Sequence, residues 1–161
     1  MERVSKELSF NNFRHNINEI KKLSESKIMA VVKADAYGHG IKNVVNILNE
    51  FNIDSFAVAT LSEALIVRKY NKKCEILIFG MIDFSKLDIV RDNNLTITLL
   101  NYDYALAVNN LGIKVKAHIK VNTGMNRVGE LHSNIDKIKS MYNLDNINAS
   151  GIYSHLSASD S

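Results

Sequence analysis

The sequence predicts an α/β fold with a parallel sheet, of the (β/α)8 TIM-barrel type and incomplete. Six apolar runs rich in β-branched residues are typical of strands, and segments with helical spacing lie between them. This alternation indicates a parallel sheet covered by helices. No Gly-x-Gly-x-x-Gly turn follows the first run, which disfavours a doubly wound dinucleotide-binding sheet. Because a closed barrel needs about 250 residues, the 161 residues are expected to hold about six of eight βα units.

The periodicity of the apolar residues places each element. Strands are expected at Ile28–Val32, Phe56–Thr60, Glu75–Phe79, Leu95–Leu100, Val115–Val121 and Ile147–Tyr153. A leading helix is expected over Phe10–Ser24. Two crossover helices are indicated by helical spacing of the apolar residues, the first by Val44, Val45, Ile47, Leu48 and Phe51, the second by Ala64, Leu65, Val67 and Tyr70.

The fifth expected strand has one apolar and one polar face. Its apolar positions are Val115, Ala117, Ile119 and Val121, and its polar positions are Lys116, His118, Lys120 and Asn122. In a barrel the apolar face would pack on helices and the polar face would point into the lumen, where branched aliphatic residues usually lie. Polar lumen residues suggest a functional site. An edge strand with one solvated face explains the alternation equally well.

Composition indicates a soluble, cytoplasmic protein. The 20 basic and 17 acidic residues, net charge +3, are scattered without basic clusters, so no nucleic-acid partner is expected. No apolar run approaches the roughly 20 residues that span a bilayer, and Met1–Ser9 lacks the apolar stretch of a secretory signal. The single cysteine, Cys74, lies in the run CEILIF and is expected to be a buried hydrophobe without a function. We assign no metal site.

Lys33 is the first candidate for chemistry. It follows an apolar run and precedes an expected loop of small residues that includes Gly38 and Gly40. Desolvation at the end of a buried strand would lower the lysine pKa, which favours attack of the amine on an aldehyde to form a Schiff base. The small residues leave room for a ligand against the backbone. A solvated lysine at the end of a strand is the alternative.

The stretch VVKADAYGHG, Val31–Gly40, resembles the cofactor-lysine signature of the alanine racemases. The resemblance implies that Lys33 holds pyridoxal 5'-phosphate (PLP) through an imine and acts as one of two catalytic bases. It also implies that Tyr37 lines the cofactor site.

The stretch HIKVNTGMNRVG, His118–Gly129, is similar to the fifth-strand segment of the same family. The resemblance implies that Arg127 binds cofactor and substrate and donates to the phenolic oxygen of PLP, a role that suits a guanidinium because it never deprotonates. It implies that Lys120, whose counterpart in the family is often carbamylated, supports Arg127. Asn122 and Asn126 depart from the Asp and Gly that are frequent at these positions in the family.

A third stretch, GIYSHLSASD, Gly151–Asp160, resembles the sixth strand of the family and implies that His155 packs against the cofactor ring. Weaker similarity is seen in SFAVATLSEALIVR, Ser55–Arg68, and around RHN, Arg14–Asn16. The resemblance therefore covers nearly the whole chain.

The resemblance implies a PLP-dependent racemase that interconverts L- and D-alanine for peptidoglycan synthesis in the cell wall and is a homodimer when full-length. Residues 1–161 would be the N-terminal portion of its barrel. The C-terminal β-domain, which supplies the second base, would be absent, so we expect this piece to be inactive alone and to associate non-natively through open sheet edges. A serine racemase, a non-catalytic PLP-binding barrel, a PLP-dependent decarboxylase of the same barrel type and a structural fragment without a ligand remain alternatives.

Overall fold

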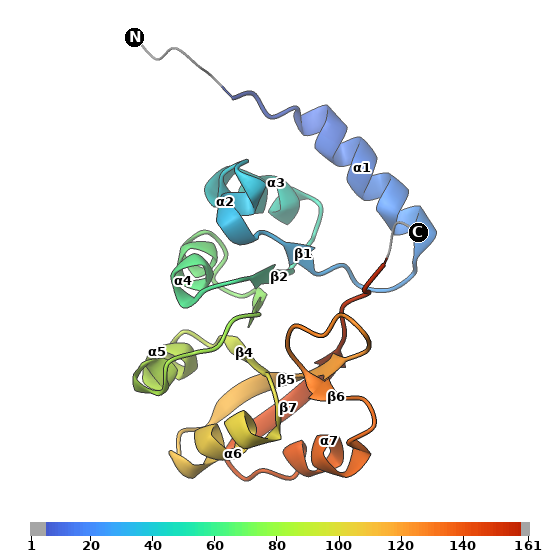
Figure 1. Ribbon diagram of the computed structural model, residues 1–161. Helices are drawn as coiled ribbons and strands as arrows, with labels where there is room; N and C mark the ends of the chain where they lie inside the picture. The colour runs from blue at the N-terminus through green and yellow to red at the C-terminus, as the bar shows by residue number, and fades with distance from the viewer. Residues whose placement is uncertain (1–5, 159–161) are drawn as a thin grey trace. The chain divides into compact units, whose positions relative to one another are not determined.

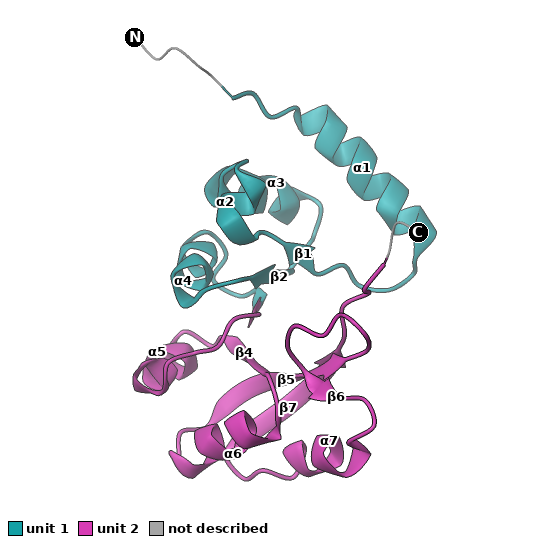
Figure 2. Ribbon diagram, in the orientation of Figure 1, with its two compact units in different colours: residues 1–76 teal, residues 77–161 magenta. Residues whose placement is uncertain are grey.

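The computed structural model describes residues 6–158, which fall into two compact units, residues 6–76 (unit 1) and residues 77–158 (unit 2) (Figure 2). Two expectations reach beyond this range. Met1–Ser5 of the segment examined for a secretory signal, and Ser159 and Asp160 of the third motif, lie outside the described residues. No helix within residues 6–158 is long and apolar enough to cross a membrane.

Unit 1 alternates helices with short strands (Figure 1). Its elements are α1 (Phe10–Leu23), β1 (Ala30–Val31), α2 (Lys33–Tyr37), α3 (Ile41–Glu50), β2 (Ser55–Val58), α4 (Leu61–Tyr70) and the first half of β3 (Glu75–Ile78). The first helix begins where the Ser9 hydroxyl accepts from the Asn12 amide at 3.3 Å. Strands β1 and β2 are parallel, with Ala30 opposite Phe56.

The core of unit 1 forms between α3 and α4 and strand β2. Helix α3 buries four residues at helical spacing, Ile41, Val44, Val45 and Leu48. In β2 the consecutive residues Phe56, Ala57 and Val58 are each 0% exposed. Burial of neighbouring positions means that this strand is covered on both faces, as is typical of parallel sheets with helices on each side.

Unit 2 continues the alternation with parallel strands. Its elements are the second half of β3, a 3-10 turn η1 (Phe84–Lys86), α5 (Leu87–Asp92), β4 (Thr96–Leu99), α6 (Tyr102–Asn110), β5 (Val115–Asn122), β6 (Glu130–Leu131), α7 (Ile135–Met141) and β7 (Ile147–Tyr153). Strand β4 pairs in parallel with both β3 and β5, and β5 pairs in parallel with β6 and β7. The expected α/β class with parallel pairing is confirmed.

Strand β5 shows the expected difference between its two faces. Its apolar positions are all buried, whereas Lys116 is exposed and His118 and Asn122 are half-buried. Lys120 is the exception on the polar face, with an exposed fraction of only 5%. Because β5 is paired with β4 on one side and with β6 and β7 on the other, it is not an edge strand. The edge-strand alternative is therefore wrong.

The β5–β7 pairing contains an irregularity that a glycine permits. Ala117 lies opposite Ala149, but the next residue, His118, lies opposite Gly151. A Cβ at Gly151 would be 2.7 Å from Nε2 of His118, so the imidazole ring packs directly on the glycine backbone. This contact needs glycine for space.

The strand boundaries agree with the sequence prediction to within one or two residues, and three differences stand out. The first strand is only Ala30–Val31 and not Ile28–Val32, and Val31 is 40% exposed. A seventh strand, β6, was not predicted, because two residues carry no periodicity. The segment after Lys33, expected as a loop, is a helical turn. Cys74 is buried as expected, and burial raises the pKa of its thiol.

Candidate functional site

The segment that follows Lys33 folds into a left-handed turn. Ala34, Asp35, Ala36 and Tyr37 have φ angles between 51° and 54°, and ψ is 47° to 49° at the first three. Each such residue costs roughly 1–2 kcal/mol, because Cβ approaches the following carbonyl oxygen. Four in succession are rare outside glycine-rich segments, and backbone strain of this kind collects at functional sites.

Backbone hydrogen bonds close the left-handed turn on itself. The Ala36 amide donates to the Val32 carbonyl at 2.9 Å, and the Gly38 amide donates to the Ala34 carbonyl at 3.0 Å. The Gly40 amide donates to the Asp35 carbonyl at 2.8 Å. Gly38, at φ 83°, and Gly40, at φ 89°, then lead into α3. The two glycines occupy the conformation that they alone adopt without strain.

Lys33 and Tyr37 lie at the two ends of this turn, in unit 1. The Nζ of Lys33 is 6.0 Å from the centroid of the Tyr37 ring. Tyr37 is 61% exposed, and Lys33 is half-buried. The sequence predicts desolvation of Lys33 at the end of a buried strand, whereas Lys33 is half-buried and Val31, two residues before it, is 40% exposed. Both side chains therefore keep part of their surface exposed to solvent.

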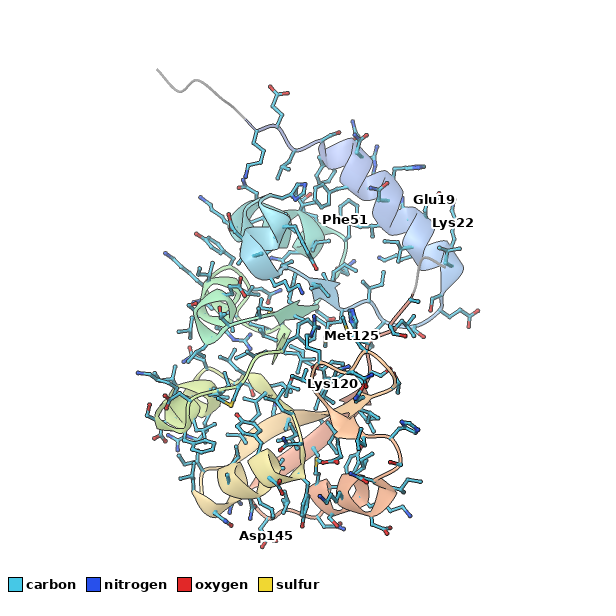
Figure 3. All side chains as sticks on the ribbon, in the orientation of Figure 1. Glu19, Lys22, Phe51, Lys120, Met125 and Asp145 are labelled. Carbon is cyan, nitrogen blue, oxygen red and sulfur yellow. The ribbon has the colours of Figure 1, made fainter. Side chains whose placement is uncertain are left out.

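Lys120, in unit 2, is buried against an aromatic ring. Its Nζ lies 5.0 Å from the centroid of the Tyr153 ring and 3.4 Å from the Val121 carbonyl oxygen. Burial, with a smaller contribution from the charge of Arg127, lowers the pKa of Lys120. Figure 3 labels Lys120 and Met125, which belong to β5 and to the loop that follows it. Withdrawal of the amine from water disfavours its charged form, which is the physical cause of the lowered pKa.

Arg127 is exposed on the loop between β5 and β6. Its charge acts on both Lys120 and Tyr153, so the structure brings these three residues together. Among residues 6–158 no carboxylate forms a salt bridge with Arg127. His155 follows β7, two residues after Tyr153, and is exposed. Of the expected site residues, Lys120, Arg127 and His155 belong to unit 2, and Lys33 and Tyr37 belong to unit 1.

Asn122 and Asn126, the two residues that depart from the pattern of the resembled family, shape the loop before Arg127. Oδ1 of Asn122 accepts from the Gly124 amide at 3.1 Å and from the Asn126 amide at 3.0 Å. Asn126 has a φ of 54°, a conformation that glycine and asparagine tolerate best. An asparagine at position 126 therefore serves the same backbone geometry as the frequent glycine.

Glu130 anchors the far end of the Arg127 loop and was not among the expected site residues. It is 6% exposed, and its carboxylate accepts from the Tyr102 amide at 2.9 Å and from Nδ2 of Asn134 at 2.6 Å. Burial acts to raise the pKa of Glu130, but its hydrogen bonds outweigh this effect, and the pKa is lowered. An isolated glutamate after glycine carries no sequence signal for such a role.

Glu63 was missed as well, although the sequence holds a signal for it. The run Thr60-Leu61-Ser62-Glu63 is a capping box at the start of α4, with the Glu63 amide 3.3 Å from the Thr60 hydroxyl oxygen. What the run does not reveal is that the same carboxylate reaches the residue after Lys33. Oε1 of Glu63 accepts from the Ala34 amide at 2.6 Å.

Comparison with known proteins gives a consistent result. Residues 8–161 match the family model of the alanine racemase N-terminal domain. The chain is 41% identical to an amino-acid racemase of Enterococcus faecalis, and the alignment covers 99% of this chain and 23% of the relative. It is 37% identical to a serine/alanine racemase of Enterococcus gallinarum, with the same coverage.

A solved structure of alanine racemase from Clostridium difficile 630 superposes with a TM-score of 0.80 at 31% identity, over 91% of this chain and 40% of that one. The expected barrel-type fold class is thereby confirmed. The chain spans less than half the length of each of these relatives. Because the family match extends over nearly all of the chain, this protein belongs to the alanine racemase N-terminal domain family.

Proposed function

We propose that this chain is the lysine-bearing part of a PLP-dependent amino-acid racemase that interconverts L- and D-alanine. The observation that carries the proposal is Lys33 at the end of β1, followed directly by a strained left-handed turn with a tyrosine at its end. A fold does not define a chemistry, so the proposal rests on these residues and on the racemases that the chain resembles.

The donor set fits PLP, an anionic aromatic aldehyde. Lys33 offers an amine that can condense with the aldehyde, and the residue is accessible because part of its surface is exposed. Arg127 offers a guanidinium that forms no salt bridge with a described residue and can donate to an acidic oxygen. Tyr37 and His155 are exposed rings that can flank an aromatic group. PLP, when bound, would supply an electron sink that stabilises a carbanion at the substrate Cα.

Each candidate site residue of this chain would have a separate role in the reaction. Lys33 would remove or return the proton at the substrate Cα from one face, as one of two bases. Arg127 would contact cofactor and substrate, holding the phenolic oxygen of the cofactor by donation alone. Lys120, whose pKa is lowered, would support Arg127, and carbamylation would turn it from a cation into an anion beside that guanidinium. His155 would pack against the cofactor ring.

The substrate class is proposed as small neutral amino acids. Alanine is the first choice, and serine is the second, because one similar protein is a serine/alanine racemase. Following the family, the complete protein would be a cytoplasmic homodimer that supplies D-alanine for the cell wall. A protein containing the additional segments of the relatives should racemise alanine, and residues 1–161 alone should do so orders of magnitude more slowly, since the second base is not assigned to them.

Reduction with borohydride followed by peptide mapping tests the proposal. In the complete protein incubated with PLP, reduction should attach the cofactor to Lys33. Lys33→Arg, which keeps the charge but cannot form an imine, should abolish the attachment, whereas Lys42→Arg, at an exposed position of α3, should leave it intact. Attachment to another lysine while Lys33 stays unmodified would overturn the assignment. Racemisation of L-serine and L-alanine measured side by side would then decide the substrate.

A further inference from the structure

The carboxylate of Glu63, in unit 1, accepts hydrogen bonds from backbone amides in two separate segments of the chain. Oε1 of Glu63 accepts from the Ala34 amide at 2.6 Å. Its Oε2 accepts from the Ala59 amide at 2.9 Å and the Thr60 amide at 3.1 Å. Ala34 directly follows Lys33, and Ala59 and Thr60 follow β2. Hydrogen bonds to a charged acceptor are stronger than neutral ones. Glu63 therefore connects the start of the left-handed turn to the segment between the end of β2 and the start of α4.

The left-handed turn needs such a tie. Its own hydrogen bonds close within residues 32–40, but its four non-glycine residues at φ 51° to 54° favour other conformations. Strain of this kind persists only where the surroundings hold the backbone in place. Side chains hold the turn at both ends: Glu63 accepts from the Ala34 amide at its start, and Oδ1 of Asp35 accepts from the Ile41 amide at 2.8 Å. Lys6 donates to the Gly38 carbonyl at the far end, so among the described side chains it is Glu63 that connects the start of the turn, next to Lys33, to a distant part of the sequence.

We propose that Glu63 is a positioning residue for Lys33. By fixing the Ala34 amide, it holds the first residue of the left-handed turn and thereby sets the direction in which the Lys33 side chain leaves the backbone. The inference deepens the proposed function, and its importance for the cofactor rests on that function. The local claim, that the carboxylate holds the turn, stands on unit 1 alone.

A purely structural role as a helix cap predicts something different. If Glu63 served only the start of α4, then any loss of capping there would have the same consequences. Thr60→Ala removes the hydroxyl that accepts from the Glu63 amide at 3.3 Å but leaves the carboxylate and its three amide contacts. Glu63→Gln keeps the shape but has a single acceptor oxygen, so the Ala34 contact and the β2 contacts cannot both survive. The two variants therefore separate capping from positioning.

A third variant supplies a rescue. Ala34 is exposed and has φ 51°, ψ 49°, so Ala34→Gly removes strain without removing a packed side chain. If Glu63 is needed because the turn is strained, Ala34→Gly should restore much of what Glu63→Gln loses. If Glu63 is only a cap, Ala34→Gly should restore nothing.

The experiment has one readout without PLP and one with it. In the full chain without PLP, amide hydrogen exchange at Gly38 and Gly40 should accelerate about tenfold or more in Glu63→Gln and by less than about twofold in Thr60→Ala. In the double variant Glu63→Gln/Ala34→Gly, the exchange rates should return most of the way to those of the wild type. With PLP, borohydride-trapped cofactor on Lys33 should fall about tenfold in Glu63→Gln and change by less than about twofold in Thr60→Ala.

The outcomes separate the two claims. Equal effects of Glu63→Gln and Thr60→Ala on exchange, or no rescue by Ala34→Gly, would overturn the positioning role. If the exchange results are as expected but PLP never attaches to Lys33 in the wild-type protein, then the proposed function fails while the hold on the turn stands. If exchange responds as expected and attachment is insensitive to Glu63→Gln, the turn is held but Lys33 is not positioned by it, and the proposal is wrong.

Discussion

The phenol of Tyr153 donates its proton to the hydroxyl of Thr98, 2.9 Å away. The direction follows from the second contact of Thr98, whose Oγ1 lies 2.7 Å from the Ile78 carbonyl oxygen. A carbonyl can only accept, so the single hydroxyl proton of Thr98 is used there, and Oγ1 must accept from Tyr153. This chain of hydrogen bonds fixes the ring against which the Lys120 amine packs.

Tyr153→Phe removes the hydrogen bond and keeps the ring. We expect a loss of about 1 kcal/mol in the free energy of unfolding, the usual contribution of one neutral hydrogen bond. Thr98 keeps its bond to Ile78, so no buried donor is left unsatisfied. Urea denaturation measures the change. Tyr142→Phe, at a ring that is 45% exposed, is the control and should change stability by less than about 0.5 kcal/mol. Equal effects would show that the Tyr153 bond contributes nothing specific.

The lowered pKa of Lys120 predicts how stability changes with pH. Between the lowered pKa of the folded state and about 10.4 in the unfolded chain, the unfolded state binds more protons, so this residue makes stability rise with pH. Tyr153 acts in the opposite direction above about pH 10, because burial raises its pKa and the unfolded state then loses its proton first.

Comparison with Lys120→Met isolates the lysine contribution. The free energy of unfolding of the wild type minus that of the variant should increase as pH rises toward 10, since the cost of the buried charge disappears. Lys116→Met, at an exposed lysine of the same strand, is the matched control for loss of a lysine side chain. Parallel curves for wild type and Lys120→Met would mean that Lys120 is not desolvated.

Gly129→Ala should disrupt the end of the Arg127 loop. A Cβ there would lie 2.7 Å from the Asn122 amide nitrogen and 2.9 Å from the Val121 carbonyl carbon, and φ is 123°. We expect a loss of about 2 kcal/mol or more, because backbone on both sides must move. Gly112→Ala is the control: its φ of 70° is strained for alanine, but no atom lies within 4 Å of the new Cβ. That variant should cost about 1 kcal/mol, and thermal unfolding measures both.

The sequence predicted those features that depend on side-chain pattern and missed those that depend on backbone geometry. The alternation in β5 correctly indicated two unlike faces, and apolar spacing located α3 and α4. The left-handed turn was not predicted because Ala34 and Ala36 carry no signal for positive φ. The role of Glu130 was not predicted because its partners, Tyr102 and Asn134, come from different elements that only the fold brings to it.

The last prediction concerns Arg127, which the proposed function places on the phenolic oxygen of PLP. Arg127→Lys keeps the positive charge but replaces a planar fork of five donors with a hydrated point charge. In the complete enzyme we expect PLP affinity and turnover each to fall by about tenfold to a hundredfold, the value of one charge-assisted hydrogen bond. Arg91→Lys is the control, because Arg91 pairs with its helix neighbours Asp88 and Asp92. Equilibrium binding of PLP and rates of D-alanine formation should change in Arg127→Lys alone. Wild-type values for that variant would show that Arg127 is a solvated charge on its loop, since a contact that lysine can replace does not need the guanidinium.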